Sequence, residues 1–394
     1  MADLLSVSLD LLASQQTASG AFIASLHFPV YRYCWLRDAS FISHALDRAG
    51  EHGAARRFHR WAAAALLRQR DKVDALRRKL ADGLPLCAGD FLPTRYREDG
   101  SPEDDDWPNF QLDGYGTWLW ALADHLERTG AGGPLEELGP AIRMVLDYLG
   151  SCWRIPNYDC WEEHGNRVHT STLACLAGGI RRIGALSGAA DALLLAEEIA
   201  DYLRRHCVVD GRLIKFTTPS EPQVRVAMAD INATSSPEVG REVDASLLWA
   251  AVPFRVLAPD EPLMRRTVAE IERTLYRRGG VHRYAGDTYY GGGLWVLLTA
   301  WLGWYYAVTG CPEKARRCLA WVEAQADERG FLPEQVSEDL NDAALLPYWV
   351  ERWGPSARPL LWSHAMYIVL KAELQAGSEE ASCGCILDEV SKKA

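Results

Sequence analysis

Several features of exported, membrane-bound or disulfide-rich proteins are missing from this sequence. The first twenty residues, MADLLSVSLDLLASQQTASG, contain no basic segment followed by a long apolar one, and no stretch approaches 18 consecutive apolar residues. We therefore expect no secretory signal, no membrane partner and a cytoplasmic location. Ten cysteines among 394 residues are too few for a disulfide framework, so we expect reduced thiols.

Basic residues and phenylalanine are also scarce. The chain has 42 Lys and Arg against 53 Asp and Glu, a net charge of −11, whereas nucleic-acid binding requires clustered Lys and Arg. We therefore expect no nucleic-acid partner. Only 9 Phe accompany 15 Trp and 15 Tyr. Because Trp and Tyr carry a polar atom, this excess indicates aromatic surface that faces a sugar or a protein interface.

Motifs for metals, phosphates and nucleophilic serine chemistry are absent or incomplete. No G-x-S-x-G pattern occurs, and the glycine triplet at 291–293 lacks the following Lys-Ser/Thr of a phosphate-binding loop. The triplet more simply lets the backbone approach a ligand or a neighbouring helix. Cys383 and Cys385 have no second pair at zinc-site spacing, and His164 and His169 lie five residues apart, a poor spacing for a helical metal pair. We therefore expect neither a metal nor a cofactor.

Apolar residues recur with a helical period along most of the chain, and alternating strand patterns are few. Glycine follows several apolar runs, as at Gly130 and Gly310, where it ends a helix. Short strands are expected only at 208–216 and 223–229. We predict about twelve helices, over residues 3–16, 38–49, 51–80, 113–129, 134–151, 169–187, 188–206, 241–256, 262–277, 291–309, 312–328 and 358–376.

Long and short connections alternate along the chain, and no low-complexity linker divides it. This alternation is typical of helical hairpins arranged in a ring with every long loop on one face, where function is expected. We predict one all-α domain over residues 1–376 and a C-terminal tail at 377–394, with a two-domain protein split near 210–240 as the alternative. The long loops cover residues 20–37, 84–112, 152–168, 207–240, 278–291 and 329–357.

The first two long loops end in polar and aromatic residues just before an apolar helix. The first ends in YRYCWLRD, where Arg37 and Asp38 beside aromatic rings could hold a polyhydroxylated ring by charge-assisted hydrogen bonds and stacking. The alternative is that Asp38 caps the helix and Arg37 is solvated. The second contains WPNFQLDGYG, which again combines Trp with Gln111 and Asp113. Asp113 could simply cap the following helix.

Carboxylates are prominent in two further loops. In the third loop Glu162 and Glu163 follow a Trp, and both a like-charged neighbour and an apolar wall favour the protonated form of a carboxyl group that a general acid needs. An exposed acidic turn is the alternative. In the sixth loop Glu334 stands among apolar residues, where a solvated Glu is unexpected. His364, on the last apolar helix, is better explained as a buried core histidine. The fourth loop has no Trp or Tyr, and we assign no site residue to it.

Five of these segments, in this order, resemble motifs of glycoside hydrolase family 15, the glucoamylase-like α-glucoside hydrolases. YCWLRDASF resembles the Trp-x-Arg-Asp substrate motif of the family, and WPNFQLDGYG resembles its second substrate loop. WEEHGNRVHTST resembles the segment with the general acid, and RYAGDTYYGGGLW the fifth loop. LPEQ followed by WGPSARPLLWSHA resembles the sixth loop, with the general base in LPEQ. The match runs from about residue 20 to 375.

The resemblance implies an (α/α)6 barrel and inverting hydrolysis that releases β-glucose from the non-reducing end of an α-glucoside. It assigns the general acid to Glu162 and the general base to Glu334. Inverting enzymes hold two such carboxyls about 6.5–9.5 Å apart, with a water beside the base. The residues that the resemblance places around the sugar are Trp35, Arg37, Asp38, Trp107, Gln111, Asp113, Trp161, Glu163, Arg283, Tyr284 and Trp295.

The length of the chain bears on the size of the substrate. Bacterial members often carry an N-terminal β-sandwich and starch-degrading members a starch-binding domain, and 394 residues leave room for neither. The fifth and sixth loops resemble members that act on α-1,6 bonds. We therefore expect a short oligosaccharide, isomaltose or an isomaltooligosaccharide, with maltose and trehalose as alternatives. Outside the family, the alternatives are a non-catalytic sugar-binding barrel and a metal-dependent helical barrel with His164, His169, His282 and His364 as ligands.

Overall fold

The computed structural model describes residues 3–103, 107–130, 132–218 and 242–391, and most of this length is helical. The α-helices are α1 (Leu4–Ser14), α2 (Leu36–Arg48), α3 (His52–Leu67), α4 (Arg70–Ala81), α5 (Asp113–Thr129), α6 (Gly132–Cys152), α7 (Thr170–Ser187), α8 (Ala190–His206), α9 (Pro262–Thr274), α10 (Val296–Val308), α11 (Pro312–Ala324), α12 (Leu346–Trp353) and α13 (Leu361–Ser391). Short 3-10 helices lie at η1 (Pro29–Tyr31), η2 (Ala88–Asp90), η4 (Ala245–Ala250), η5 (Tyr289–Gly291) and η6 (Ala343–Leu345).

Inner and outer elements alternate along most of the chain, with α4 and α12 as interruptions, and their contacts form a double ring. In the described part of the chain, α2 packs against α5, α5 against α7, α7 against η4, η4 against α10, α10 against α13, and α13 against α2. These contacts close an inner ring of six elements. Each inner element also packs against at least one of the outer helices, which are α1, α3, α6, α8, α9 and α11. The fold is therefore the all-α barrel that the sequence predicts.

Three predicted segments differ from the observed ones. The helix expected over 241–256 is only the 3-10 helix η4, which Asp244 begins by accepting the N–H of Ser246 and which ends shortly before Pro253, a residue without an N–H. The helix expected over 51–80 is two helices, α3 and α4. The loop expected at 329–357 contains a further helix, α12.

Large aromatic side chains fill the centre of the inner ring. The ring centroids of Trp249 and Trp301 lie 5.2 Å apart, and Trp362 lies 5.4 Å from both Trp301 and Phe41. These four residues come from four different inner elements, and each is at most 3% exposed. Interiors pack at the density of organic crystals, so the space that six elements enclose is filled by indole and phenyl rings. Trp301 therefore serves the packing of the inner elements.

The long loops lead into the N-terminal ends of the inner elements, and short strand pairs connect them. β1 (Cys34–Trp35) pairs with β2 (Arg95–Tyr96), which joins the first two loops. β3 (Val168–His169) pairs with β6 (Phe216–Thr217), and β9 (Leu294–Trp295) pairs with both β8 (Gly280–Val281) and β10 (Gln335–Val336). The remaining strands are β4 (Val208–Val209), β5 (Arg212–Leu213) and β7 (Tyr276–Arg277). The functional loops therefore meet at one end of the barrel.

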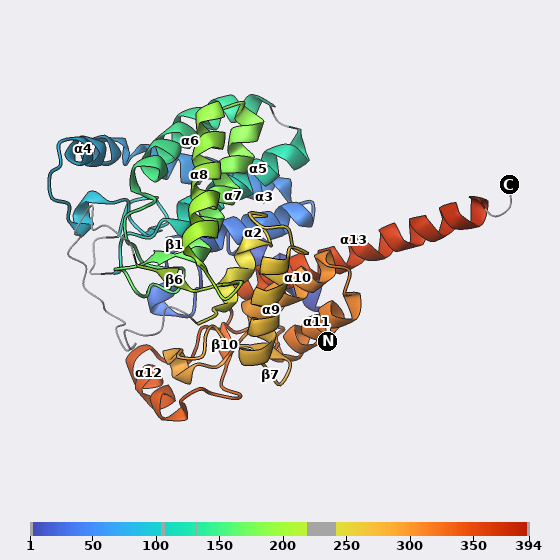
Figure 1. The fold of residues 1–394 in the computed structure, drawn as a ribbon. Helices are drawn as coiled ribbons and strands as arrows, with labels where there is room; N and C mark the ends of the chain where they lie inside the picture. Colours follow the sequence, from blue (N-terminus) through green and yellow to red (C-terminus); the bar gives the residue numbers. More distant parts are fainter. Residues whose placement is uncertain (1–2, 104–106, 131, 219–241, 392–394) are drawn as a thin grey trace.

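The end of the chain extends the last inner helix. The backbone of α13 is helical to Ser391, and its C-terminal part projects from the barrel in Figure 1. The division into a domain at 1–376 and a tail at 377–394 stays a prediction. The strand expected at 223–229 lies outside the described residues. Among those residues, no helix is long and apolar enough to span a membrane, and all eight cysteines with described side chains are free thiols.

Candidate active site

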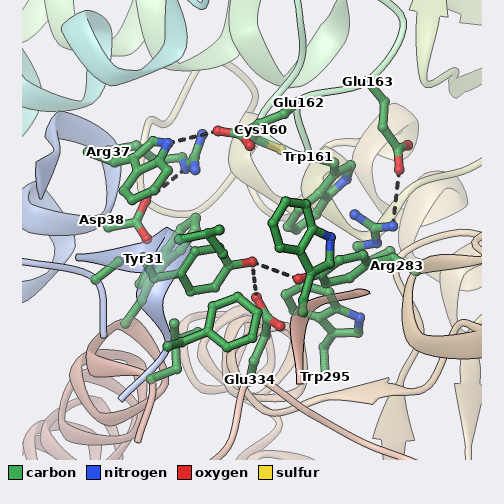
Figure 2. Close-up of a pocket in the computed structure, with 18 of the residues that line it drawn as sticks. Tyr31, Arg37, Asp38, Cys160, Trp161, Glu162, Glu163, Arg283, Trp295 and Glu334 are labelled. Carbon is green, nitrogen blue, oxygen red and sulfur yellow. Dashed lines mark hydrogen bonds and ion pairs between the residues drawn. The ribbon is translucent and has the colours of Figure 1, made fainter. Parts of the chain in front are cut away.

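The loops enclose a pocket of about 300 Å³, within the range of small-molecule sites. Figure 2 shows Glu162 and Glu334 on different sides of it, with aromatic rings between them. Motifs far apart in the sequence therefore contribute to one cavity. Ten of the thirteen predicted site residues line it: Trp35, Arg37, Asp38, Trp107, Trp161, Glu162, Glu163, Arg283, Trp295 and Glu334.

Gln111 and Asp113 are not among the residues that line the pocket, and both contact a residue that does. Nη1 of Arg37 donates to Oε1 of Gln111 at 3.1 Å and to Oδ2 of Asp113 at 3.0 Å, while its Nε donates to Asp38 at 3.1 Å. The helix begins at Leu36, so Asp38 lies in its first turn and is not the cap. Arg37 and Asp38 are each 6% exposed, which excludes the solvated alternative.

Tyr284 likewise lies behind a lining residue. Its hydroxyl donates to Oε2 of Glu163 at 2.5 Å, and Arg283 donates to Oε1 of Glu163 at 3.1 Å and also to Asp287. Burial alone would raise the pKa of Glu163, but Arg283 and Lys215, whose Nζ lies 3.6 Å from Oε2, hold that pKa below its ordinary value. Glu163 is therefore fixed as a carboxylate.

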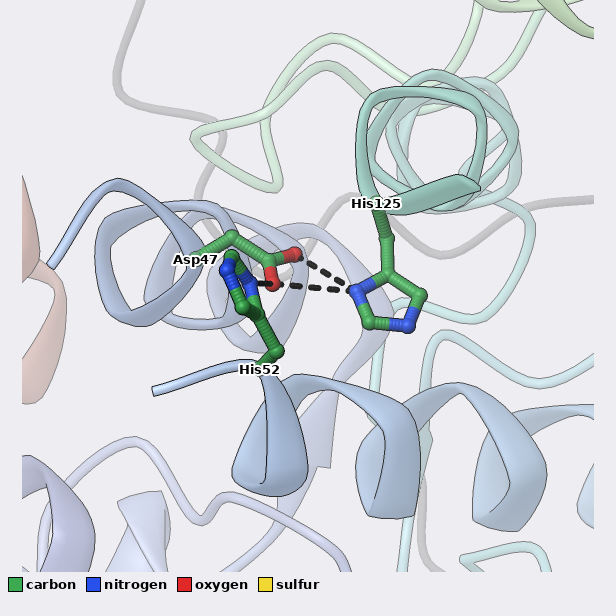
Figure 3. Close-up of side chains that lie close together, drawn as sticks. All are labelled: Asp47, His52 and His125. Carbon is green, nitrogen blue, oxygen red and sulfur yellow. Dashed lines mark hydrogen bonds and ion pairs between the residues drawn. The ribbon is translucent and has the colours of Figure 1, made fainter. Parts of the chain in front are cut away.

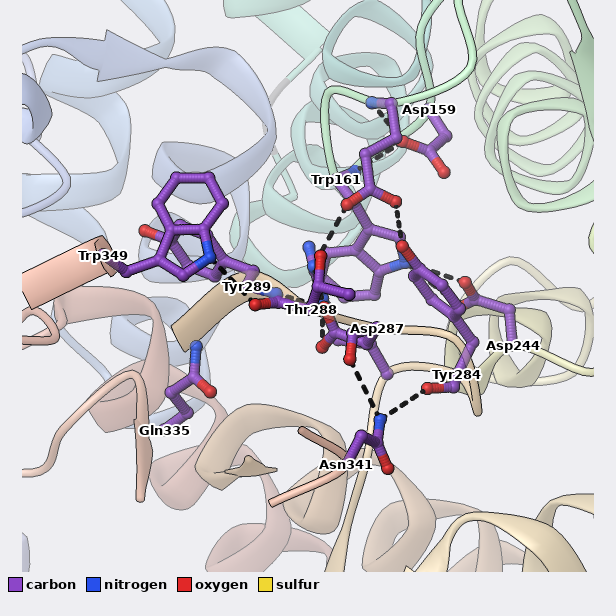
Figure 4. A network of polar contacts seen from close by, with 12 residues as sticks. Asp159, Trp161, Asp244, Tyr284, Asp287, Thr288, Tyr289, Gln335, Asn341 and Trp349 are labelled. Atoms are coloured by element: carbon purple, nitrogen blue, oxygen red, sulfur yellow. Dashed lines mark hydrogen bonds and ion pairs between the residues drawn. The ribbon is translucent and has the colours of Figure 1, made fainter. Parts of the chain in front are cut away.

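Lys215 comes from the fourth loop, to which the sequence assigned no site residue. It is fully enclosed, 3.2 Å from Oδ2 of Asp244 and 3.8 Å from Oδ2 of Asp159. Asp244 accepts the indole N–H of Trp161 with both oxygens, at 3.0 and 3.1 Å (Figure 4). Burial raises the pKa of Asp159 to about 7, and Lys215 opposes this rise. Lys215 thus anchors the wall behind Trp161 and Glu163 without lining the pocket.

Glu162 projects into the pocket from a tight turn. Its φ of 67° is in the left-handed region, which non-glycine residues rarely adopt. Asp159 fixes the turn by accepting the backbone N–H groups of Trp161 and Glu163 at 3.0 and 2.9 Å. The indole N–H of Trp35 donates to Oε1 of Glu162 at 2.7 Å.

Glu334 lies among hydroxyl groups and aromatic rings. The hydroxyl of Tyr31 donates to its Oε1 at 2.9 Å and lies 2.9 Å from the hydroxyl of Tyr289, and Ser356 lies 3.4 Å from Oε2. Burial raises the pKa of Glu334 to about 7, against the opposing effects of Tyr31 and Arg283. The surroundings of Glu334 therefore do not hold this carboxyl firmly ionised near neutral pH.

Aromatic rings form most of the remaining wall. Trp35 lies edge-on to Trp107 with centroids 6.0 Å apart, and Trp161 lies 5.5 Å from Trp295. The guanidinium of Arg283 stands over Trp161 and Trp295, 5.4 and 5.2 Å from their ring centroids. Such rings offer flat apolar faces next to charged donors. A pyranose, with an apolar face and a rim of hydroxyls, matches this combination.

The glycine triplet serves the packing of two loops. A Cβ on Gly292 would lie 2.2 Å from the carbonyl oxygen of Asp287, and one on Gly293 would lie 2.2 Å from that of Val336. Gly291 and Gly292 also have φ values of 79° and 69°, which glycine adopts without strain. The sequence predicts that the backbone at this triplet approaches a ligand or a neighbouring helix. In the structure, the backbone at Gly293 instead approaches the loop that contains Val336. This close approach seats the segment containing Glu334 against the strand that ends at Trp295.

His364 is a core histidine, as predicted. It is fully buried, its Nδ1 lies 2.8 Å from Oγ of Ser8, and its Nε2 accepts the backbone N–H of Leu332 at 2.9 Å. Burial lowers its pKa to about 3, so the ring is neutral. The histidine thereby holds the backbone two residues before Glu334.

A possible metal-ligand set lies at the other end of α2. In the part of the chain that the structure describes, one group of three candidate ligands is close enough, namely Asp47, His52 and His125 (Figure 3). Nδ1 of His52 lies 2.8 Å from Oδ1 of Asp47, and Nδ1 of His125 lies 3.0 Å from both oxygens. Hydrogen bonds within the group already satisfy these atoms. His169, expected to be no ligand, lies 3.1 Å from the carbonyl oxygen of His164 through its Nε2.

Several residues that line or support the pocket were not predicted. Tyr31 stands four residues before Trp35 in the first motif, so its position among aromatic residues was the available signal. Lys215 has no such signal, because nothing in its surrounding sequence distinguishes it from a solvated lysine. The other unpredicted polar or aromatic residues that line the pocket are Phe28, Thr288, Tyr289, Trp349, Arg352, Trp353 and Trp362.

Comparisons with protein families, curated proteins and solved structures all find glycoside hydrolases. The family model described as "Glycosyl hydrolases family 15" matches residues 4–319. An isomaltose glucohydrolase of Kribbella flavida is 39% identical over 370 residues, which cover 92% of this chain and 90% of that protein. A glycosidase variant solved in complex with glucose is 39% identical, with a TM-score of 0.85, covering 94% of this chain and 96% of the other. A bacterial glucoamylase complexed with acarbose, at 21% identity and a TM-score of 0.71, covers 95% of this chain and 55% of the other and shares the fold.

Proposed function

Since this chain belongs to glycosyl hydrolase family 15, we propose that it is an inverting exo-glucosidase that releases β-glucose from short α-1,6-linked glucosides. The observation that carries this proposal is the meeting of Glu162 and Glu334 in one aromatic pocket. General acid and base catalysis by two carboxyls, with a water beside the base, requires such an arrangement.

In this proposal Glu162 is the general acid and protonates the glycosidic oxygen. The indole N–H of Trp35, which donates to its carboxyl group, orients it toward the bond. Glu334 is the general base and takes a proton from the attacking water. The hydroxyl of Tyr31, 2.9 Å from its Oε1, holds the base in position. Attack on the face opposite the leaving oxygen inverts the anomeric carbon and yields β-glucose.

Two charged pairs bind the glucose that is released. Arg37 and Asp38, held by Gln111 and Asp113, would clamp hydroxyls deep in the pocket, since bidentate guanidinium and carboxylate groups suit adjacent hydroxyls. Glu163, fixed as a carboxylate beside Arg283, would accept a further hydroxyl. The walls would be Trp35, Trp107, Trp161 and Trp295. None of these steps uses a metal or a cofactor.

The proposed preference for an α-1,6 bond is supported by the similarity to the isomaltose glucohydrolase of Kribbella flavida. That protein matches this chain over nine tenths of both lengths. Maltose and trehalose are the alternative substrates. The expectation of a cytoplasmic location stays a prediction.

The test is a comparison of isomaltose, maltose, trehalose, kojibiose and nigerose at equal concentration, with the anomer of released glucose followed by NMR. We expect the highest kcat/KM for isomaltose and β-glucose as the first product. Release of α-glucose would contradict the inverting mechanism. A higher kcat/KM for maltose or trehalose would contradict the linkage. Folded protein that releases glucose from none of the five would overturn the proposal.

A further inference from the structure

Helix α12 forms part of the edge of the pocket. Its residues Trp349, Arg352 and Trp353 line the cavity. Arg352 is exposed and Trp353 is half-buried, whereas Asp38 and Glu334 in the same cavity are only 6% and 3% exposed. The cavity therefore runs from a buried inner part, which holds the carboxylates, to a solvent-facing edge at α12.

The position of α12 is fixed by the neighbouring loop. The indole N–H of Trp349 donates to the carbonyl oxygen of Thr288 at 2.9 Å, and its ring lies edge-on to Tyr289 with centroids 5.0 Å apart. The hydroxyl of Tyr290 donates to the carbonyl oxygen of Gly354, just after the helix, at 2.8 Å. Because Tyr289 also contacts the hydroxyl that holds Glu334, α12 is built into the same wall as the base.

Arg352 presents a guanidinium above aromatic rings at this edge. It lies 4.8 Å from the ring centroid of Trp353 and 5.6 Å from that of Trp349, and its Nη1 donates to the hydroxyl of Tyr348 at 3.0 Å. Among the described residues, no carboxylate lies within 4.0 Å of this guanidinium. A guanidinium carries five N–H donors, so several are available to acceptors in the cavity. Donors next to an indole face suit the hydroxyls and apolar face of a sugar.

In an exo-acting hydrolase with a closed inner pocket, the leaving sugar lies on the open side of that pocket. The glucose to be released occupies the buried part of the pocket, so the rest of the substrate must extend toward the open edge. An α-1,6 bond includes an exocyclic methylene, and the leaving ring therefore stands one bond farther from the catalytic carboxyls than in an α-1,4 bond. The α12 edge lies at the outer end of the cavity, where such a ring must lie.

We propose that Arg352 and Trp353 of α12 bind the leaving glucose unit, Arg352 by hydrogen bonds to its hydroxyls and Trp353 by contact with its apolar face. This site rests on the proposed function and assigns the choice of substrate to α12, whose last residue, Trp353, begins the motif WGPSARPLLWSHA. The two residues bind the sugar and take no part in proton transfer.

The test compares two substrates that differ in the leaving group. Isomaltose carries a leaving sugar, whereas α-glucosyl fluoride carries none but offers the same glucose to the inner pocket. For Arg352→Ala and for Trp353→Ala we expect kcat/KM on isomaltose to fall about tenfold or more, mainly through KM, since an interaction made equally in ground and transition state affects KM. On α-glucosyl fluoride kcat/KM should stay within about twofold. Arg352→Lys should recover part of the loss.

The matched control is Arg154→Ala. Arg154 stands 4.5 Å from the ring centroid of Trp153, on an exposed surface away from the pocket lining, and its loss should leave both substrates unaffected. An unchanged kcat/KM on isomaltose in both α12 variants would overturn this inference. An equal fall on both substrates would overturn it as well, because α12 would then only support the inner pocket. A wild-type protein that cleaves neither substrate would instead refute the proposed function.

Discussion

Glu163 and Glu334 are two carboxyls in one pocket, and their surroundings shift their pKa values in opposite directions. Glu163 meets two cations and a phenol, and its pKa lies below the ordinary value despite burial. Glu334 meets hydroxyls and rings, and burial raises its pKa to about 7. The comparison shows that burial alone does not set the charge of a carboxyl in this pocket. In this pocket the carboxyl in direct contact with cations stays ionised, whereas the carboxyl that hydroxyls and aromatic rings surround can gain a proton near neutral pH.

The largest expected effect comes from removing the base. Glu334→Gln keeps the shape and the hydrogen bond from Tyr31 but cannot take a proton, so kcat on isomaltose should fall about 10²–10⁴-fold. Glu338→Gln, in an exposed position of the same segment, is the matched control and should keep full activity. Steady-state kinetics on both variants measures this. A rate in Glu334→Gln within tenfold of wild type would place the base elsewhere.

The next effect tests the cation beside Glu163. Lys215→Met removes the ammonium group that lies near Asp159, Glu163 and Asp244. Because removal of one partner leaves buried charges uncompensated, the free energy of unfolding should fall by roughly 3–5 kcal/mol. Lys314→Met removes a surface partner of Glu272 and should cost about 0–1 kcal/mol. Urea unfolding followed by circular dichroism gives both values. Equal stabilities of the two variants would show that Lys215 does not hold the network together.

The smallest expected effect is a shift in the pH dependence of kcat/KM. Because the base acts in its ionised form and its pKa is about 7, kcat/KM should rise as pH increases through about 7. The hydrogen bond from Tyr31 lowers that pKa, so Tyr31→Phe should move this limb to higher pH. A pH profile of kcat/KM, which reports the free enzyme, measures the change. A limb that stays in place or moves to lower pH would contradict the role of Tyr31.

The sequence predicted the barrel more completely than the details of its wall. The 3.6-residue period and the alternation of loops are local properties, so the ring of helices follows from them. The helix α12 could not be seen this way, because its hydrogen bond from Trp349 to Thr288 joins distant segments. The pocket motifs were found, but motifs do not separate a residue that lines a cavity from one that supports it. Asp113 and Tyr284 stand in the same kind of motif as residues that line the pocket, but they contact Arg37 and Glu163 without lining it.

The hydrogen bond from Tyr31 to Glu334 joins residues 303 positions apart in the chain. A contact of such long range forms only after nearly the whole polypeptide has been brought together, and closing so long a loop is entropically costly and slow. The segment with Glu334 lies just before α13, which packs against α2 and closes the inner ring. Catalytic activity is accordingly a reporter of complete folding, and a chain that stops before α13 would possess most of the sugar-binding motifs yet lack a finished site.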